Sequence, residues 1–532
     1  MTTSLVDLCA SHGIEPTYRD NDGHERLVPL ETLATLAEAF ALTEPAPAPP
    51  TGVAEARAEE WPPRCHVPEA LEHARVWGVT CQLASLPSRR NLGLGDFADL
   101  AAFAQMAAAE GADFIGLNPL HAGFWSDPAR RSPFSPSNRR FLNPLYLAVE
   151  WIEGFAGLDD AEVHEAERLR ALPLLDHPGT AALKDRVLRR LFDAFPWDDG
   201  LRGAFAGFVA AGGAALASHA LFEALSEAMT AEGRGAGWMG WPEPLRDRQS
   251  PDVQAFAAAR PRAVDYHLWL QWQASRQLAR VRDMARGAGM RVGLYLDFAV
   301  GAVPDGSATW HDPELTVPGL SIGAPPDAFS TLGQDWGLAP LSPPRLAQLD
   351  GAPMAEVMRA IMQYAGAIRL DHAMGLARLW LIPRGALPIT GAYVRSPLSC
   401  LLRRLSEESH AAGCMVIGED LGTLPWGFRD LIAERRIHGM KVLLFEQGPE
   451  GFHEPGHWPR DAFACFGTHD LPTFAAWWQG ADIALRQSVG RLDDAAAAYA
   501  TQIRAAEREA LLRLLGGDGD ALSPGVHARL AT

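Results

Sequence analysis

The chain has 532 residues, of which 48% are hydrophobic and 21% charged, a composition typical of folded proteins. Its formal net charge of −18 disfavours partners that present phosphate groups, so we expect neither a nucleic acid nor a membrane as partner. The length accommodates a barrel of about 250 residues with attached subdomains.

The six cysteines are far apart, with no CxxC pair and no Cys/His cluster at zinc spacing, which indicates a reducing compartment and no metal site. The N-terminal residues MTTSLVDLCASHG lack a basic segment followed by an apolar one, so no signal peptide is expected. The uncharged stretch from Gly203 to Phe222 approaches the length of a membrane span, but its many Ala and Gly residues favour a packed helix. We therefore predict a cytoplasmic protein.

The N-terminal part predicts a small helical segment. A helix is expected around Leu30 to Leu42, with Pro29 as a start signal. The Pro/Ala-rich stretch from Glu44 to Ala56 is typical of an extended linker. We expect residues 1–70 to form this segment with its linker, and residues 71–532 to form the main domain.

In the main domain, short apolar runs alternate with helical patterns, which indicates parallel strands buried on both faces. This order predicts an α/β fold, a (β/α)8 TIM barrel with a mainly helical insertion at about 150–260. The runs cover residues 77–83, 113–120, 291–300, 366–371, 414–420, 441–447 and 463–470. Seven runs are one too few for a closed barrel. Either one strand is hidden in the sequence or the chain ends before the eighth, and we favour the second interpretation.

Three carboxylates, Asp371, Glu419 and Asp470, come at the ends of predicted strands. Residues at the carboxyl ends of barrel strands face a common opening, so we expect the three to lie together. Cleavage of a glycosidic bond needs a neutral carboxylic acid and an ionised carboxylate. The pattern thus predicts a glycoside-active site.

The motifs that contain these residues resemble a known family. RLDH, GED and THD, in this order at strand ends, resemble the α-amylase clan. Longer segments resemble the 4-α-glucanotransferases, or amylomaltases, of glycoside hydrolase family 77. These segments are LASLPSRRNLGLGDF, SPFSPSNRRFLNP, GAPPDAFSTLGQDWG, GAYVRSP, VIGEDLGTLP and THDLPT. Members of the family continue past the last residues of this chain into a final strand, in line with the count of seven.

The resemblance implies a role for each carboxylate: Asp371 as nucleophile, Glu419 as general acid/base and Asp470 as stabiliser of the distorted sugar. Arg369 lies two residues before Asp371 on the same strand, so it points to the same side and is expected to keep that carboxylate ionised. The resemblance also implies sugar-binding residues, with the segment 323–337 as a loop over the opening. They are His372, His469, Asp297, Asp327, Gln334 and Trp336. No metal or other cofactor is expected.

The leading hypothesis is a 4-α-glucanotransferase that moves α-1,4-glucan segments between malto-oligosaccharides through a covalent intermediate, with retention of configuration. Two alternatives stay open: an α-glucan hydrolase of the same clan, which would share all three carboxylates, and an inactive, truncated glucan-binding protein. The sequence gives no indication of the oligomeric state.

Overall fold

The computed structural model describes residues 4–20, 23–46, 52–58, 64–327, 330–448 and 451–515. The chain divides into two compact units, Met1–Ile437 and His438–Thr532. Each unit is described by itself.

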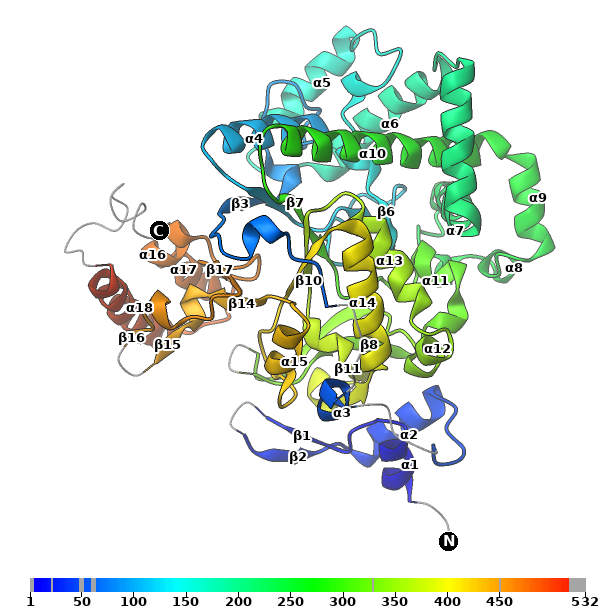
Figure 1. Ribbon diagram of the computed structural model, residues 1–532. Coiled ribbons are helices and arrows are strands. Elements are labelled where there is room, and N and C mark those ends of the chain that lie inside the picture. Colours follow the sequence, from blue (N-terminus) through cyan, green and yellow to red (C-terminus); the bar gives the residue numbers. More distant parts are fainter. Residues whose placement is uncertain are drawn as a thin grey trace. The chain divides into compact units, whose positions relative to one another are not determined.

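A five-stranded parallel sheet in the order β13-β10-β7-β4-β3 lies at the centre of the first unit (Figure 1). Its strands match the first five predicted runs. They are β3 (Gly78–Cys81), β4 (Phe114–Leu117), β7 (Gly293–Phe298), β10 (Ala367–Leu370) and β13 (Met415–Gly418). The three middle strands are buried along their whole length, which explains why their sequences are continuously apolar and do not alternate.

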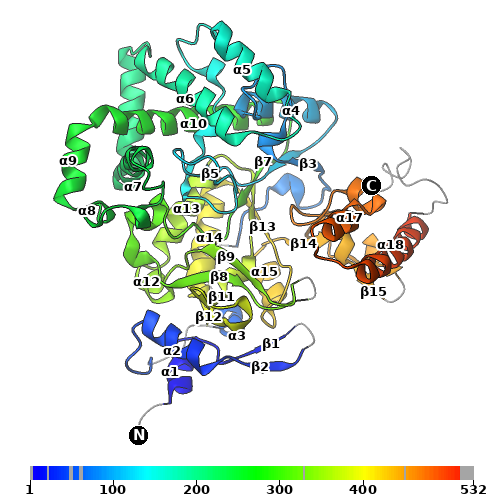
Figure 2. The same cartoon turned by 180° about the vertical axis from the view of Figure 1, so that it is seen from behind.

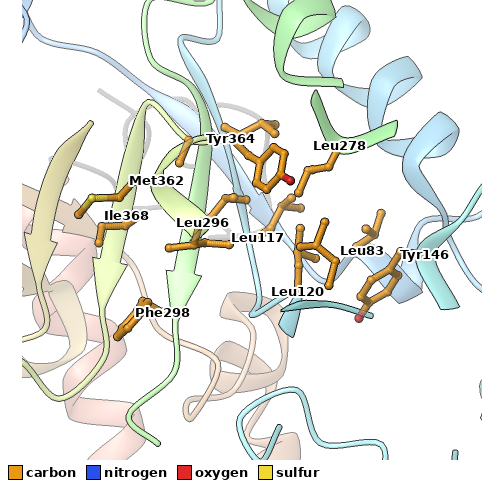
Figure 3. Close-up of a cluster of buried hydrophobic side chains, with 14 of the residues drawn as sticks. Leu83, Leu117, Leu120, Tyr146, Leu278, Leu296, Phe298, Met362, Tyr364 and Ile368 are labelled. Atoms are coloured by element: carbon orange, nitrogen blue, oxygen red, sulfur yellow. The ribbon is translucent and has the colours of Figure 1, made fainter. Parts of the chain in front are cut away.

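Side chains from the middle strands meet in the core (Figure 3). Leu296 on β7 is paired in register with Leu117 on β4 on one side and with Ile368 on β10 on the other. Leu296 and Ile368 are fully buried. Helices pack against these strands and close the core. They are α4 (Phe97–Ala109), α10 (Pro261–Gly287), α13 (Ala352–Met362) and α14 (Leu398–Ala412).

The other two predicted runs lie in the second unit, where β14 (Gly439–Val442) pairs in parallel with β17 (Ala462–Cys465). The prediction for β14 was shifted, because the strand ends at Val442 and Leu443–Phe445 form a 3-10 turn instead. A short hairpin and three helices complete the described part of this unit. They are β15 (Gln447–Gly448), β16 (Gly451–Phe452), α16 (Phe474–Gln479), α17 (Ala481–Ser488) and α18 (Asp494–Leu514). The central sheet is thus mostly parallel, as expected. That the strands belong to a (β/α)8 barrel, and that the eighth strand is missing from this chain, stay predictions.

A second, antiparallel sheet in the first unit was not predicted (Figure 2). Its order is β12-β11-β8-β9, from the strands Ala392–Arg395, Arg378–Pro383, Leu320–Ala324 and Gln334–Leu338. The expectation that residues 323–337 form only a loop was therefore wrong, because both ends of the segment belong to the β8–β9 hairpin. Its glycines fit this hairpin, since Gly333 and Gly337 have positive φ angles of 78° and 67°.

The N-terminal segment packs on the antiparallel sheet. It contains α1 (Leu5–Ser11), β1 (Thr17–Arg19), β2 (Glu25–Leu27) and α2 (Leu30–Ala39), the last of which matches the predicted helix. Ile14 forms a bridge with Val394, and the Thr32 hydroxyl donates to the Thr390 carbonyl at 2.6 Å. In the predicted linker, residues 47–51 lie outside the described residues and Val53–Ala58 form a helix, α3. The domain boundary near residue 70 stays a prediction.

The segment at 150–260 is helical, as predicted. It contains α5 (Asp160–Arg170), α6 (His177–Asp193), α7 (Asp199–Ala231), α8 (Glu243–Arg246) and α9 (Pro251–Ala259). Among the described residues, α7 alone is long and apolar enough to cross a membrane, a test that core helices also pass. It packs against α10 and α11 (Ser307–His311), and Phe222 and Leu225 are fully buried. The remaining elements of the unit are β5 (His121–Ala122), β6 (Asn138–Leu142), α12 (Pro343–Gln348) and α15 (Phe428–Glu434).

Leu296→Ala is expected to lower the free energy of unfolding by about 2–5 kcal/mol, because it leaves a cavity among fully buried neighbours. Leu174→Ala is the matched control, since that side chain is 81% exposed and its loss should cost no more than about 0.5 kcal/mol. Thermal unfolding followed by circular dichroism measures both. Equal melting temperatures for the two variants would contradict this description of the core.

Candidate active site

The carboxyl ends of β7, β10 and β13 carry the ionisable residues of the site. Asp297 lies on β7 opposite Arg369 on β10, in the parallel register. Asp371 follows β10 directly and Glu419 follows β13 directly. The Glu419 amide donates to the Leu370 carbonyl at 3.0 Å, which continues the pairing of the two strands to their ends. Two of the three predicted catalytic carboxylates therefore lie at neighbouring strand ends.

One guanidinium connects two of these carboxylates. Arg369 Nη1 lies 3.0 Å from both oxygens of Asp297 and 2.8 Å from Asp371 Oδ1, the contact that the two-residue spacing predicted. Burial disfavours the charge on Arg369, but the carboxylates around it raise its pKa above the ordinary value. Burial also raises the pKa of Asp297, and the Arg369 charge opposes that rise. The guanidinium thus favours the ionised form of Asp297, although burial still raises the pKa of that carboxyl to about 7.

Glu419 has a different environment. Its two oxygens accept hydrogen bonds from the backbone amides of His372, at 3.0 Å, and Leu421, at 2.9 Å. Its side chain is 8% exposed, and burial raises its pKa to about 7, a rise that Arg369 limits and Asp371 increases. Near neutral pH the group is therefore half protonated, as a general acid/base requires.

One predicted sugar-binding residue of the β9 strand, Trp336, lies beside His372, and a second, Gln334, is bound to Trp336. The indole of Trp336 contacts the His372 ring edge-on at 5.0 Å between centroids, and Trp336 Nε1 donates to Gln334 Oε1 at 3.1 Å. Burial lowers the pKa of His372 to about 4, so its ring is neutral at pH 7. Its Nε2 atom is buried and has no hydrogen-bond partner in the part of the chain that the structure describes. The hydrogen-bonding capacity of this atom is therefore unused among the described residues.

Asp327 occupies the turn between β8 and β9. Its carboxylate accepts a hydrogen bond from the Ser330 amide at 2.6 Å, and its own amide donates to the Ser330 carbonyl at 3.0 Å. The side chain therefore closes the turn that precedes Gln334 and Trp336. Its predicted contact with glucan stays a prediction.

The remaining two predicted residues, His469 and Asp470, belong to the second unit. They follow β17, and His469 Nε2 lies 3.3 Å from Asp470 Oδ1. The Asp470 side chain is 75% exposed, and its amide donates to the Thr468 hydroxyl at 3.3 Å. Their predicted roles at the same substrate stay predictions.

Sequence reasoning did not find the partner of Asp420. This carboxylate, 6% exposed, accepts a hydrogen bond from Arg429 Nε at 2.8 Å, and Arg429 Nη2 donates to the Asp420 carbonyl at 3.1 Å. Arg429 lies in α15, nine residues after Asp420, and nothing in the GED motif itself indicates the pairing. Within the described ranges, no three His, Cys, Asp or Glu side chains are placed to hold a metal ion.

Comparisons with known proteins agree with the chemistry of these groups. The model of glycoside hydrolase family 77, described as 4-alpha-glucanotransferase, matches residues 81–531. The chain belongs to this family. A 4-alpha-glucanotransferase of Haemophilus influenzae is 35% identical over 486 residues, covering 86% of this chain and 69% of the relative. One of Mycobacterium tuberculosis is 38% identical over 481 residues, covering 86% of this chain and 65% of the relative. The chain thus spans about two thirds of the length of these curated relatives.

Solved structures of family members have the same fold. An amylomaltase from Corynebacterium glutamicum superposes with a TM-score of 0.81 at 27% identity, covering 96% of this chain and 85% of that one. An amylomaltase from Streptococcus agalactiae, solved with acarbose, gives 0.70 at 18% identity over 86% of this chain and 88% of that one. This chain thus has the fold of the amylomaltases.

Arg369→Met is expected to destabilise the protein by about 3–5 kcal/mol near neutral pH, because it leaves buried carboxylates without their cation. Loss of the cation raises the pKa of Asp297 in the folded state further above its value of about 7, whereas an unfolded carboxyl has a pKa of about 4. The difference in stability between variant and parent therefore grows as the pH rises above about 7 and shrinks on acidification. Melting temperatures of variant and parent should differ more at pH 8 than at pH 5.

Arg369→Lys is the matched control, since it keeps a cation at the site. It should show a smaller destabilisation and a weaker dependence on pH. A difference in melting temperature between Arg369→Met and the parent that is the same at both pH values would contradict the electrostatic explanation.

Proposed function

We propose that this chain is an active 4-α-glucanotransferase that moves α-1,4-glucan segments between malto-oligosaccharides. The observation that carries the proposal is the pair of unlike carboxyl groups at neighbouring strand ends. Asp371 lies against the Arg369 guanidinium, whereas Glu419 has a pKa raised to about 7. One group is suited to attack and the other to proton transfer.

In the first step, an Asp371 oxygen attacks the anomeric carbon of the donor while Glu419 gives its proton to the leaving glycosidic oxygen. A glucosyl ester of Asp371 forms, and the shortened glucan leaves with a free 4-hydroxyl. In the second step, the ionised Glu419 takes the proton of an acceptor's 4-hydroxyl, whose oxygen attacks the anomeric carbon and releases Asp371. Two inversions give net retention.

The spacing of the strands supports retention. Strands of a sheet lie about 4.8 Å apart, and Asp371 and Glu419 follow adjacent strands whose pairing extends to Glu419. We expect their carboxyl groups to lie about 5–5.5 Å apart, the separation of retaining enzymes.

We also propose that the parallel strands belong to a (β/α)8 barrel and that the protein is cytoplasmic.

We assign the remaining roles by the family motifs. Asp470 would bind hydroxyls of the reacting glucose and favour its distorted form. His372 and His469 would hydrogen-bond the same sugar, and the buried, unpartnered Nε2 of His372 supports its part. Asp297 would support Arg369, to which it is bound at 3.0 Å. Contacts further along the glucan are assigned to Asp327, Gln334 and Trp336.

Incubation with pure maltotriose tests transfer against hydrolysis. A transferase yields glucose together with maltodextrins longer than maltotriose, whereas a hydrolase yields only shorter products. Asp371→Asn should lower the rate by about 10⁴-fold, because an amide is a poor nucleophile. Product chromatography that shows nothing longer than the substrate would overturn the proposal.

The rate should depend on pH through Glu419. Because its pKa is raised to about 7, the proton needed in the first step is lost above that pH, and kcat/KM for maltotriose should fall about tenfold per pH unit. Glu419→Gln should remove the activity. Circular dichroism over the same range controls for unfolding. A profile that stays level to pH 9 would show that Glu419 is not the acid.

A further inference from the structure

Trp426 is the most exposed large apolar side chain among the described residues, at 88%. It ends the loop that begins after Glu419 at the end of β13. Single exposed apolar residues are common and need no special explanation. What sets Trp426 apart is the groove beside it.

The groove has a volume of about 380 Å³ and lies between α3 and the start of α15. Val53, Ala54, Arg57 and Ala58 form one side, and Trp426, Gly427 and Glu434 form the other. Gly427 has a positive φ of 77°, and a Cβ atom there would lie 3.6 Å from Val53, so the two sides are in close contact at the base. Trp426 stands at the edge of this contact.

Both sides of the groove are held in place. Ala56 of α3 is fully buried, and its carbonyl accepts a hydrogen bond from Arg435 Nη2 at 3.2 Å. Arg57 donates from Nε to Glu434 Oε2 and from Nη1 to Asp430 Oδ2, each at 3.3 Å. The polar groups of the groove are therefore arranged before any ligand arrives, which lowers the entropy cost of binding.

The chemistry of the groove favours a neutral, hydroxyl-rich ligand. Arg57 is paired with both Glu434 and Asp430, and Arg435 and Arg64 also act on Glu434, so the charged groups here are matched by opposite charges and no unpaired carboxylate attracts a cation. The carboxylate oxygens retain lone pairs that can accept from hydroxyl groups. The indole supplies a broad apolar face, and a glucose ring offers one face of C–H groups with hydroxyls at its rim. The combination fits a sugar ring.

We propose that Trp426 and the groove between α3 and α15 bind a segment of α-1,4-glucan at a distance from the bond that reacts. The identity of the ligand rests on the proposed function. Trp426 lies seven residues after Glu419, so their Cα atoms are at most about 25 Å apart. A long glucan could occupy the groove and the candidate active site together, and the second contact would raise its affinity.

Isothermal titration of the Asp371→Asn chain with long maltodextrin tests the proposal, because this background should turn over ligand about 10⁴-fold more slowly than the parent. Trp426→Ala in that background should weaken binding about 10-fold, the loss expected for one stacked ring. Trp426→Phe should retain most of the affinity, since a smaller aromatic face remains. Trp77→Ala is the matched control, because Trp77 is 48% exposed and does not line the groove; it should bind like the parent.

Equal affinity for maltodextrin in the Trp426→Ala and parent chains would overturn the site. A parent dimer that becomes monomeric with Trp426→Ala on gel filtration would also overturn it, because the groove would then be an interface between copies. The two proposals fail separately. If maltotriose gives no products longer than itself while binding still depends on Trp426, the proposed transfer activity is wrong and the proposed glucan site is supported.

Discussion

The site depends on one buried cation that serves more than one carboxylate. Arg369 binds Asp297 through both oxygens and contacts Asp371 at 2.8 Å, while Glu419 adds a third acidic group nearby. One positive charge cannot neutralise three negative charges in a poorly solvated place, so the group that gives up its charge at the lowest cost takes a proton. Two groups share that cost: the pKa of Glu419, which makes no ion pair with the guanidinium among the described residues, and the pKa of Asp297 are both raised to about 7. Sharing one cation thus distinguishes Asp371, which contacts the guanidinium, from Glu419, which does not.

The sheet makes this sharing possible. Arg369 and Asp297 are opposite one another in the parallel register, and Leu370 pairs with Gly418, so Asp371 and Glu419 leave adjacent strands at the same level. A slip of one residue would turn every side chain of β10 to the other face and would break both contacts of Arg369. The buried core formed by Leu117, Leu296 and Ile368 resists such a slip. Packing several ångströms away therefore maintains the electrostatics of the site.

The sequence predicted the three middle parallel strands well because each is buried along its whole length, which requires a continuous apolar run. It also predicted the contact of Arg369 with Asp371, since two residues on one strand share a face. The antiparallel sheet was missed for the opposite reason. Most of β9 is exposed and polar, and the glycines and prolines before it resemble those of a loop. Register between distant strands, which decides the partner of Asp297, is not encoded in any local pattern. The partner of Asp420 depends instead on how α15 packs, because Arg429 lies in that helix.

The loop after β13 connects the buried carboxyl group of Glu419 to the exposed side chain of Trp426 within a few residues. At its start, Leu421 donates to Glu419, and Asp420 is bound to Arg429 of α15. At its end, Gly427 turns the chain into α15, whose Asp430 and Glu434 are bound to Arg57 of α3. Because both ends are anchored by their own hydrogen bonds and ion pairs, a change at the exposed Trp426 has no direct route to the carboxyl group of Glu419. A substitution of Trp426 at the surface can therefore change the affinity for a ligand while the environment that sets the pKa of Glu419 stays the same.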